Sequence, residues 1–222
     1  MNGVWRSAFL ALLTVGVVSI AAWLVFFSSV LGVRDIRVVG NLAIPAQQVQ
    51  QAAGVPTGRP LAVVDVAEVE KRIRRIRQIE TVRVSRGWPG TLVVEIVERE
   101  PLAVVPVGPK FAVMDRHGVM TEIKDTAPAS LPVLRVDRPQ PGDPATGAAL
   151  AVMAALPGDL GRLVAEVLAP SPETVSLRLK DGRAVVWGGR DRPAEKAKIL
   201  LTLLKRPADT YDVSSPDVVT VK

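Results

Sequence analysis

The feature that most constrains this chain is an uncharged apolar run at residues 8–32. At about 1.5 Å per helical residue the run reaches roughly 37 Å, enough to cross a hydrocarbon core of about 30 Å with some tilt. A secretory signal normally has an apolar region of about 7 to 15 residues, so the length favours an uncleaved anchor over a signal cut near Gly32. We therefore expect a transmembrane helix over residues 8–32, preceded by a cytoplasmic head of residues 1–7.

The charged residues indicate which side of the membrane holds most of the chain. Arg6 is the only one of the 28 Lys and Arg residues before residue 32, and none of the 22 acids lies there, so residues 33–222 carry 27 − 22 = +5. This favours a cytoplasmic N-terminus and an exported remainder, although Arg34 and Arg37 weaken the charge argument. A basic surface of mixed sign suits anionic headgroups or an acidic partner, and nucleic acid is not expected outside the cell.

The exported part must be stabilised by hydrophobic cores, because the chain has no cysteine to form disulfides. About 190 residues allow one or two domains, and we expect two, at residues 33–101 and 102–222. The expected class is α+β. The first domain has the order strand, helix, helix, strand, strand, and the second is a mixed β-rich domain with an antiparallel sheet and helices.

In the first domain a strand at residues 33–39 precedes two amphipathic helices. The first helix lies between Pro45 and Gly54, and the second has apolar residues spaced three and four apart. Two strand-like runs around the Gly-Trp-Pro-Gly sequence at residues 87–90 predict a hairpin, in which Trp88 is expected to rigidify the turn rather than serve as an exposed recognition aromatic. The expected core consists of Leu92, Val94 and Ile96 against Ile73 and Ile76.

The second domain shows more strand signals. The clearest is a hairpin at residues 174–180 and 183–187, whose Asp181-Gly182 turn is the favoured two-residue type. Other strands are expected at residues 103–107, 111–115, 119–121, 211–213 and 218–221. Helices are expected at residues 148–156, at residues 160–168, and from Pro193 to before Pro207.

Residue types that carry enzyme chemistry are few and isolated. His117 is the only histidine, so a zinc site or a histidine-dependent nucleophile lacks partners. Glu98 and Glu100 follow the strand period, which favours a structural role for them and for Glu95 over acid–base catalysis. No phosphate-binding glycine loop occurs. We therefore predict no catalytic residue, no metal site and no cofactor.

A basic run at residues 71–77 is the first candidate contact surface. Each basic side chain near an anionic membrane surface contributes about 1 kcal/mol, so the run is a candidate for contact with lipid or with an acidic partner. A run of this kind is more often the solvated side of an amphipathic helix, and we favour that interpretation. The residues concerned are Lys71, Arg72, Arg74 and Arg75.

The terminal strand at residues 218–221 is the stronger candidate. The last strand of a sheet usually leaves one edge unpaired, and a partner can add its own strand to that edge; a covered internal strand is the alternative. The expected partner-binding residues are Tyr211, Val213, Ser215, Val218, Val219, Thr220 and Val221.

The order of these features resembles a known family. Together with the anchor, the sequences IRVVGN, LAVVD, VRVSRGWPGTL and VEREPLA, at residues 36–41, 61–65, 82–92 and 97–103, are similar to the FtsQ/DivIB family of bacterial cell-division proteins. Residues 114–119 and 211–215 support this. The resemblance implies a polypeptide-transport-associated (POTRA) domain followed by an FtsQ-type β domain. The seven-residue head is shorter than in many relatives, so the resemblance does not extend to contacts inside the cell.

The resemblance also implies a function. It implies a non-enzymatic scaffold at the division septum of the cytoplasmic membrane, binding the membrane-anchored coiled-coil proteins FtsB and FtsL and linking early division components to the septal peptidoglycan synthase. The alternatives are a membrane-anchored cell-wall enzyme, which needs paired carboxylates or a nucleophile with its base in one pocket, and a POTRA-type protein-transport component, for which a cleaved signal is expected.

Overall fold

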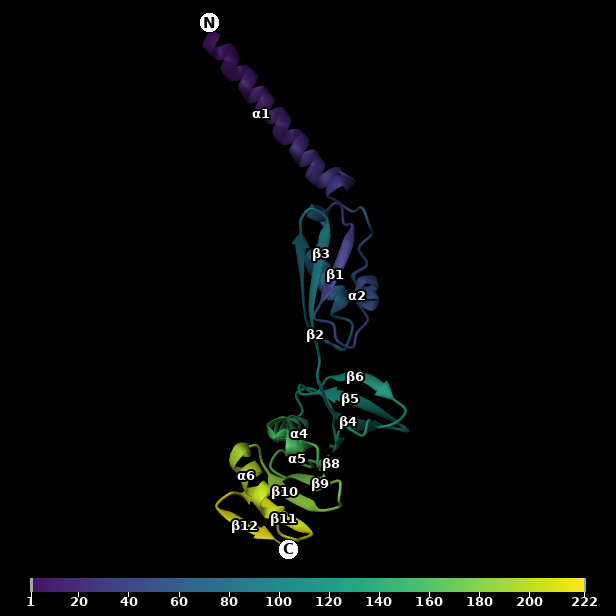
Figure 1. The fold of residues 1–222 in the computed structure, drawn as a ribbon, viewed down its shortest axis with the longest axis vertical. Coiled ribbons are helices and arrows are strands. Elements are labelled where there is room, and N and C mark those ends of the chain that lie inside the picture. Colours follow the sequence, from purple (N-terminus) through teal and green to yellow (C-terminus); the bar gives the residue numbers. More distant parts are fainter. Residues whose placement is uncertain (1, 222) are drawn as a thin grey trace. The chain divides into compact units, whose positions relative to one another are not determined.

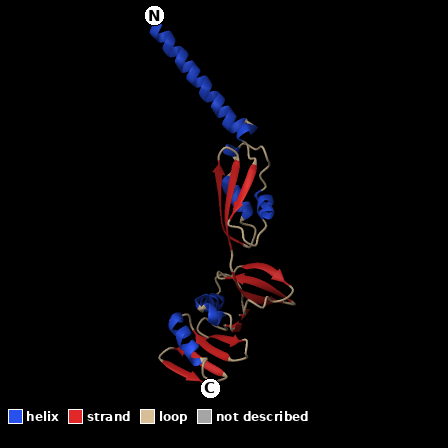
Figure 2. Cartoon of the chain, in the orientation of Figure 1, coloured by secondary structure: helices blue, strands red, loops and turns tan. Residues whose placement is uncertain are grey.

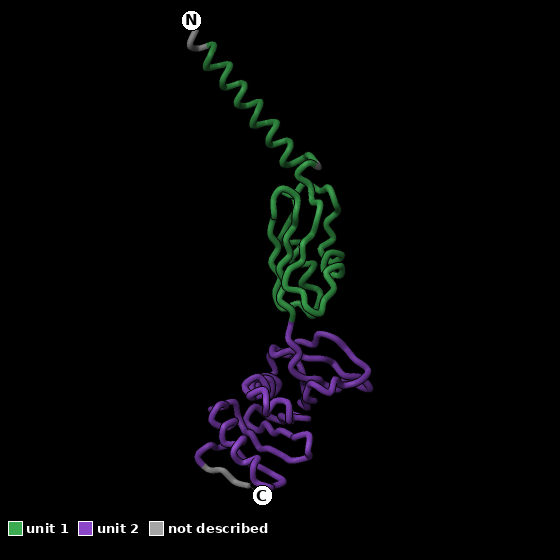
Figure 3. The backbone as a smooth tube through the Cα atoms, viewed as in Figure 1, with its two compact units in different colours: residues 1–98 green, residues 99–222 purple. Residues whose placement is uncertain are grey.

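The computed structural model describes residues 2–221, with side chains described for residues 5–28 and 30–217. The chain divides into two compact units, Met1–Glu98 and Arg99–Lys222, here called unit 1 and unit 2 (Figure 3). Both combine helices with strands (Figure 2). The expected fold class, an N-terminal apolar helix followed by α+β structure, is confirmed.

Unit 1 begins with a long apolar helix, α1 (Asn2–Phe27). Its stretch Trp5–Phe27 has a mean hydropathy of 2.5, and within residues 2–221 it is the one helix whose length and composition fit a membrane crossing. The Ser28 hydroxyl accepts a hydrogen bond from the Val30 N–H, and the short 3-10 helix η1 (Ser29–Leu31) follows. The helix expected over residues 8–32 therefore differs at both ends. It begins earlier, at Asn2, and it ends at Phe27 because the turn at Ser28 replaces the helical hydrogen bonding.

The rest of unit 1 has the expected order of strand, helix, helix, strand, strand. Its sheet has the order β1-β3-β2, with β1 parallel and β2 antiparallel to the central β3 (Figure 1). The elements are β1 (Asp35–Val39), α2 (Ala46–Ala53), the 3-10 helix η2 (Leu61–Val63), α3 (Val66–Ile73), β2 (Ile79–Gly87) and β3 (Thr91–Glu98).

Local chemistry explains where these helices begin and end. Gly54 adopts a left-handed conformation and closes α2 by donating its N–H to the Gln50 and Gln51 carbonyls. The Asp65 carboxylate caps α3 by accepting from the Glu68 N–H at 3.1 Å. The α3 helix ends at Ile73, one turn earlier than the apolar spacing predicts, and Ile76 packs on the core from the following turn.

The core of unit 1 lies between the helices and one face of the sheet. Leu92, Val94 and Ile96 of β3 are buried against α2 and α3 in the cluster that contains Ile73, as expected. Each such side chain stabilises the fold by roughly 1.5–3 kcal/mol. At the end of β1 the chain passes very close to β3, because a Cβ added to Gly40 would lie 2.2 Å from the Ile96 carbonyl oxygen.

Unit 2 contains one sheet of nine strands in the order β12-β11-β10-β9-β8-β7-β4-β5-β6. The first six strands along the chain are β4 (Pro101–Val107), β5 (Lys110–Asp115), β6 (Met120–Lys124), β7 (Val133–Arg135), β8 (Val164–Leu168) and β9 (Val175–Leu179). The last three are β10 (Ala184–Gly188), β11 (Thr210–Ser215) and β12 (Val218–Val221). The helices are α4 (Pro144–Ala155), α5 (Gly158–Gly161) and α6 (Pro193–Leu203).

Most of the expected elements of unit 2 are confirmed, including the hairpin of β9 and β10 around Asp181-Gly182 and the helix opened by Pro193. The sheet is mixed rather than antiparallel throughout, because β4 with β7, β7 with β8, and β10 with β11 pair in parallel. One face is covered by α4 and α6, which share a core with Trp187, Tyr211 and Leu177.

The helix expected at residues 160–168 is wrong. A single helical turn, α5, ends at Gly161, and Val164–Leu168 form the strand β8 between β7 and β9. Apolar residues in this segment recur at spacings of three and four, which suits a helix. Pairing with strands on both sides outweighs that local preference, since tertiary context routinely overrides propensity.

Candidate functional site

The candidate docking edge is formed by the last two strands of unit 2. β11 pairs in parallel with β10 on one side and antiparallel with β12 on the other, with Asp212 opposite Thr220. Within residues 2–221, β12 has no strand on its second side. The backbone of residues 218–221 is therefore available along one edge.

The structure places the expected partner-binding residues in different environments. Tyr211 and Val213 are fully buried beneath α6, so these two side chains belong to the core. Ser215 is exposed at the end of β11. The side chains of Val218, Val219, Thr220 and Val221 lie outside the described residues.

Tyr211 anchors β11 through a polar network. Its hydroxyl donates to the Arg206 carbonyl at 2.6 Å and accepts from Arg183 Nη1 at 3.0 Å. The Arg183 guanidinium lies 5.5 Å from the centre of the Tyr211 ring and also bonds the Asp181 carboxylate at 2.7 Å. The Tyr211 hydrogen bond, and then the Asp181 carboxylate, raise the pKa of Arg183. β11 is therefore held rigidly on its inner side.

The turn between β11 and β12 is tied to the start of α6. Arg192 donates to both oxygens of Asp217 at 3.0 and 3.3 Å, and this bond holds the pKa of the Asp217 carboxyl below its usual value. Arg192 has φ of 43°, in the left-handed region that costs a non-glycine residue energy. No sequence signal links these residues, which are 25 positions apart.

A buried lysine supports the same loop. The Lys196 side chain is completely buried and donates to the Gly189 carbonyl at 3.0 Å and to Asp191 Oδ1 at 3.1 Å. This hydrogen bond lowers the pKa of the Asp191 carboxyl. A buried ammonium with two acceptors fixes the loop that presents Arg192, since an unpaired charge there is strongly disfavoured.

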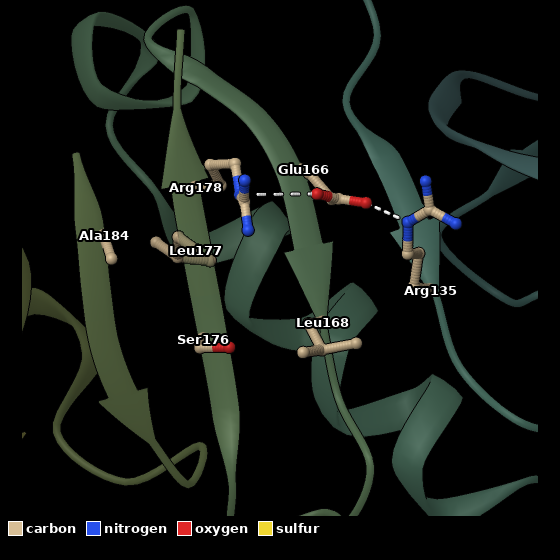
Figure 4. Close-up of a pocket in the computed structure, with 7 residues that line it drawn as sticks. All are labelled: Arg135, Glu166, Leu168, Ser176, Leu177, Arg178 and Ala184. Atoms are coloured by element: carbon tan, nitrogen blue, oxygen red, sulfur yellow. Dashed lines mark hydrogen bonds and ion pairs between the residues drawn. The ribbon is translucent and has the colours of Figure 1, made fainter. Parts of the chain in front are cut away.

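The face of the sheet away from α4 and α6 carries a charged groove of about 420 Å³ (Figure 4). Arg135 of β7 and Arg178 of β9 point toward Glu166 of β8 from its two sides, and the second pair is separated by 3.6 Å. Two guanidinium groups share one carboxylate, which leaves an excess positive charge. Leu168 and Ser176 continue the lining. Sequence reasoning missed this cluster because it depends on strand register.

The basic run at residues 71–77, which begins in the last turn of α3, is largely engaged within unit 1. Arg72 donates through Nε and Nη2 to the Ala53 carbonyl, at 3.0 and 2.5 Å. Lys71 and Arg74 form ion pairs with Glu68 and Glu70, at 3.9 and 3.7 Å. Arg75 is exposed. Contact of this run with lipid or a partner stays a prediction.

Comparison with known families decides the assignment. A model of the "POTRA domain, FtsQ-type" matches residues 31–99, and a model of "Cell division protein FtsQ/DivIB, C-terminal" matches residues 103–218. The chain belongs to the FtsQ/DivIB family. The resemblance inferred from the sequence is confirmed, and the chain is a cell-division protein of this family, with an N-terminal helix that fits a single-pass membrane anchor.

Curated relatives named "Cell division protein FtsQ" agree. The chain is 47% identical over 201 residues to that of Mycolicibacterium smegmatis, covering 90% of this chain and 60% of the relative. It is 40% identical over 216 residues to that of Mycobacterium bovis, covering 97% and 68%, and 39% identical over 209 residues to that of Streptomyces bingchenggensis, covering 90% and 79%. The chain thus spans about 60% of the length of the first of these relatives.

A solved structure of the extracytoplasmic domain of DivIB from Geobacillus stearothermophilus, in its trans isomer, aligns with 50% of this chain and 98% of that one. The identity is 22% and the TM-score 0.37, too low to bear on the FtsQ/DivIB assignment.

Proposed function

We propose that this chain is a bitopic scaffold of the division machinery that works without catalysis. In this proposal α1 crosses the cytoplasmic membrane with the N-terminus inside, and the two units lie outside at the division septum. The scaffold docks FtsB- and FtsL-like coiled-coil proteins and so connects early division proteins to septal peptidoglycan synthesis. Support comes from membership of the FtsQ/DivIB family and from the anchor-like helix.

The observation that carries the docking proposal is the chemistry of the end strands. Sheets in the described chain end in β1, β2, β6 and β12. Charged residues, which protect an edge from pairing with other chains, occur in the first three: β1 reads DIRVV, β2 IETVRVSRG and β6 MTEIK. β12 reads VVTV and has none. It is therefore the end strand best suited to accept a partner's strand.

The proposed mode is strand addition. An incoming segment bonds the free N–H and C=O groups of β12 and extends the sheet of unit 2 by one strand. Main-chain hydrogen bonds contribute affinity in this mode, and side chains on alternate residues contribute specificity. Tyr211 and Val213 then act by holding β11 in the core rather than by touching the partner.

A pair of proline substitutions tests this mode. Successive N–H groups along a strand point to opposite sides, so of Val219→Pro and Thr220→Pro one removes a donor facing β11 and the other a donor facing the free edge. The full chain in lipid nanodiscs is titrated with the exported segment of an FtsB-like partner, and melting is followed in parallel. We expect one variant to melt at lower temperature, and the other to melt normally but bind about tenfold more weakly, as loss of one hydrogen bond requires.

If both prolines leave binding unchanged in a folded chain, the docking surface lies elsewhere. The proline substitution Ile123→Pro in β6 serves as a matched control at the other edge of the same sheet, and it should leave partner binding unaffected.

A further inference from the structure

One end of the sheet in unit 1 lies close in sequence to the end of α1. The row of paired residues Asp35, Thr91 and Gly87 marks this end, where β1 and β3 begin and β2 finishes. We call it the proximal end and define it as residues 32–35, 57–63 and 86–90. Three separate segments of the chain contribute to it.

Hydrogen bonds join these segments into one rigid surface. The Val33 N–H donates to the Arg59 carbonyl and the Gly58 N–H to the Val33 carbonyl, each at 2.8 Å. The Arg34 N–H donates to the Gly90 carbonyl at 2.8 Å. Arg86 then joins η2 to β2, because its Nε and Nη2 donate to the Leu61 and Val64 carbonyls at 3.0 and 2.7 Å.

The tether between α1 and this surface is short. Gly32 bridges Pro60, so the proximal end begins five residues after Phe27, the last residue of α1. With three of those residues in η1 at about 2.0 Å each and two extended at about 3.5 Å, the path is at most about 13 Å. A headgroup layer is roughly 5–8 Å thick. A membrane-spanning α1 therefore keeps the start of the proximal end no more than about 8 Å beyond the headgroup layer.

The exposed side chains of the proximal end match that environment. Trp88 is 53% exposed and Val63 42% exposed. Tryptophan is enriched at membrane interfaces because its ring is amphipathic. Arg34 and Arg59 are exposed, and Arg34 folds back toward the anchor to donate from Nη2 to the Val30 carbonyl at 2.7 Å. Arg34, Arg59 and Arg86 outnumber the one acid within these three segments, Asp35.

We propose that the proximal end rests on the lipid headgroup layer. Trp88 and Val63 enter the interface, and Arg34 and Arg59 bind the phosphate groups of anionic lipids. The inference rests on the proposed anchor, since it needs α1 to cross the membrane. It gives the POTRA domain a fixed orientation on the bilayer, which a flexible tether alone does not provide.

The opposite end of the same sheet provides an internal control. Leu42, in the loop after β1, is 92% exposed and lies beyond Val39, which pairs with Glu95 far from the proximal row. Leu42 is as apolar as Val63. If apolarity alone drew unit 1 to lipid, both ends would bind, whereas the short tether brings only the proximal end close to the bilayer.

Single spin labels on the full chain test the proposal. The chain has no cysteine, so one introduced cysteine carries the label at a chosen site. The sites are Val63→Cys at the proximal end, Leu42→Cys at the opposite end and Gly16→Cys within α1, where an added side chain meets nothing within 4 Å. Electron paramagnetic resonance measures the accessibility of each label to oxygen, which partitions into lipid, and to a water-soluble nickel chelate.

In vesicles containing phosphatidylglycerol we expect the Gly16 label to favour oxygen, the Leu42 label to favour nickel, and the Val63 label to shift toward oxygen. Trp88→Ala should reduce that shift. Arg34→Gln together with Arg59→Gln should remove its dependence on phosphatidylglycerol, since each arginine contributes about fivefold to association with an anionic surface.

The label accessibilities distinguish a failure of the headgroup contact from a failure of the proposed anchor. A Val63 label as accessible to nickel as the Leu42 label, with the Gly16 label protected, overturns the headgroup contact and leaves the anchor intact. A Gly16 label accessible to nickel overturns the anchor itself, and the headgroup contact with it.

Discussion

Glu98→Gln should loosen the loop between β1 and α2. The Glu98 carboxylate accepts from three successive backbone N–H groups, at 2.7 Å from Leu42, 3.0 Å from Ala43 and 2.9 Å from Ile44. Consecutive N–H groups pointing at one anion form a nest that a neutral group fills poorly. The last residue of β3 thereby fixes a loop more than 50 positions earlier in the chain.

The size of the effect follows from the number of bonds. Hydrogen bonds to an ionised acceptor contribute about 1.5–3 kcal/mol and neutral ones about 0.5–1.5 kcal/mol. The glutamine amide keeps one oxygen in the place of Oε1, which all three N–H groups reach, but it removes Oε2, to which the Ala43 N–H also donates. The bonds that remain are neutral and therefore weaker. Because Glu98 is only partly buried, we take the lower values and expect local opening to become easier by about 2 kcal/mol, roughly 30-fold.

Hydrogen exchange with peptide-level mass spectrometry measures this loop directly. Pro45 has no amide, so a peptide covering residues 41–45 reports mainly Leu42, Ala43 and Ile44. Glu95→Gln is the matched control, because Glu95 lies on the exposed face of the same strand. Exchange in Glu98→Gln that equals the wild type at neutral pH refutes the reasoning, since the carboxylate would then not hold the loop.

Acid should reproduce the substitution. Burial raises the pKa of Glu98, but the hydrogen bonds from Ile44, Leu42 and Ala43 outweigh it and leave the pKa below its usual value. A group with a lowered folded pKa stabilises the fold fully above its unfolded pKa, about 4.3 for glutamate, and loses this effect as pH falls through the folded pKa. The exchange difference between wild type and Glu98→Gln, corrected for intrinsic rates, should therefore vanish at low pH and be full at neutral pH.

Two further substitutions test close packing and the β12 turn. Gly40→Ala should destabilise unit 1 by about 3 kcal/mol or more, because the new Cβ meets the Ile96 carbonyl at 2.2 Å. Gly58→Ala is the control, because Gly58 has a similar φ, 83° against 85°, and open space around the added Cβ. Equal melting temperatures of the two variants would contradict the clash. Arg192→Gly should relieve the backbone strain at φ 43° but release Asp217, so amide exchange in β12 should rise without a lower melting temperature of unit 2. Unchanged exchange in β12, or equal acceleration in Glu195→Gln, would show that this ion pair does not position the turn.

The elements predicted correctly from the sequence are those that depend on local chemistry. The hairpin around Asp181-Gly182 and the helix opened by Pro193 were predictable because each depends on neighbouring residues. The strand β7 has three residues and carries no periodic signal, and its parallel pairing with β8 is fixed by residues more than 30 positions apart. The helix expected at residues 160–168 failed for the same reason, because β7 and β9 decide its conformation.

The candidate site was predictable in its backbone and not in its side chains. An apolar final run indicates a strand, and a final strand tends to lie at an edge, which is where the sheet order places β12. The alternation along β11 did not reveal that Tyr211 and Val213 face the core. The position of α6 decides which face of this strand is covered, and the sequence of β11 does not contain that information. The Arg192–Asp217 pair and the Glu166 cluster bring together residues from separate elements, so no local sequence pattern predicts them.

An uncharged end strand invites pairing with a second copy, and the structure limits that hazard by geometry instead of charge. β12 has four residues, and its register with β11 shifts between Asp212 and Ser215, so this edge is short and irregular. So short an edge gives few hydrogen bonds, and a docked strand needs further contacts to bind stably. The open face of the sheet offers them, because Asp212 lies opposite Val186, in the row that continues through Ser176 and Leu168 to Arg135. A partner can add a strand to β12 and also place an acidic side chain toward this row, and both contacts add to its affinity. A second copy of β12 carries no charge, so it lacks the second contact.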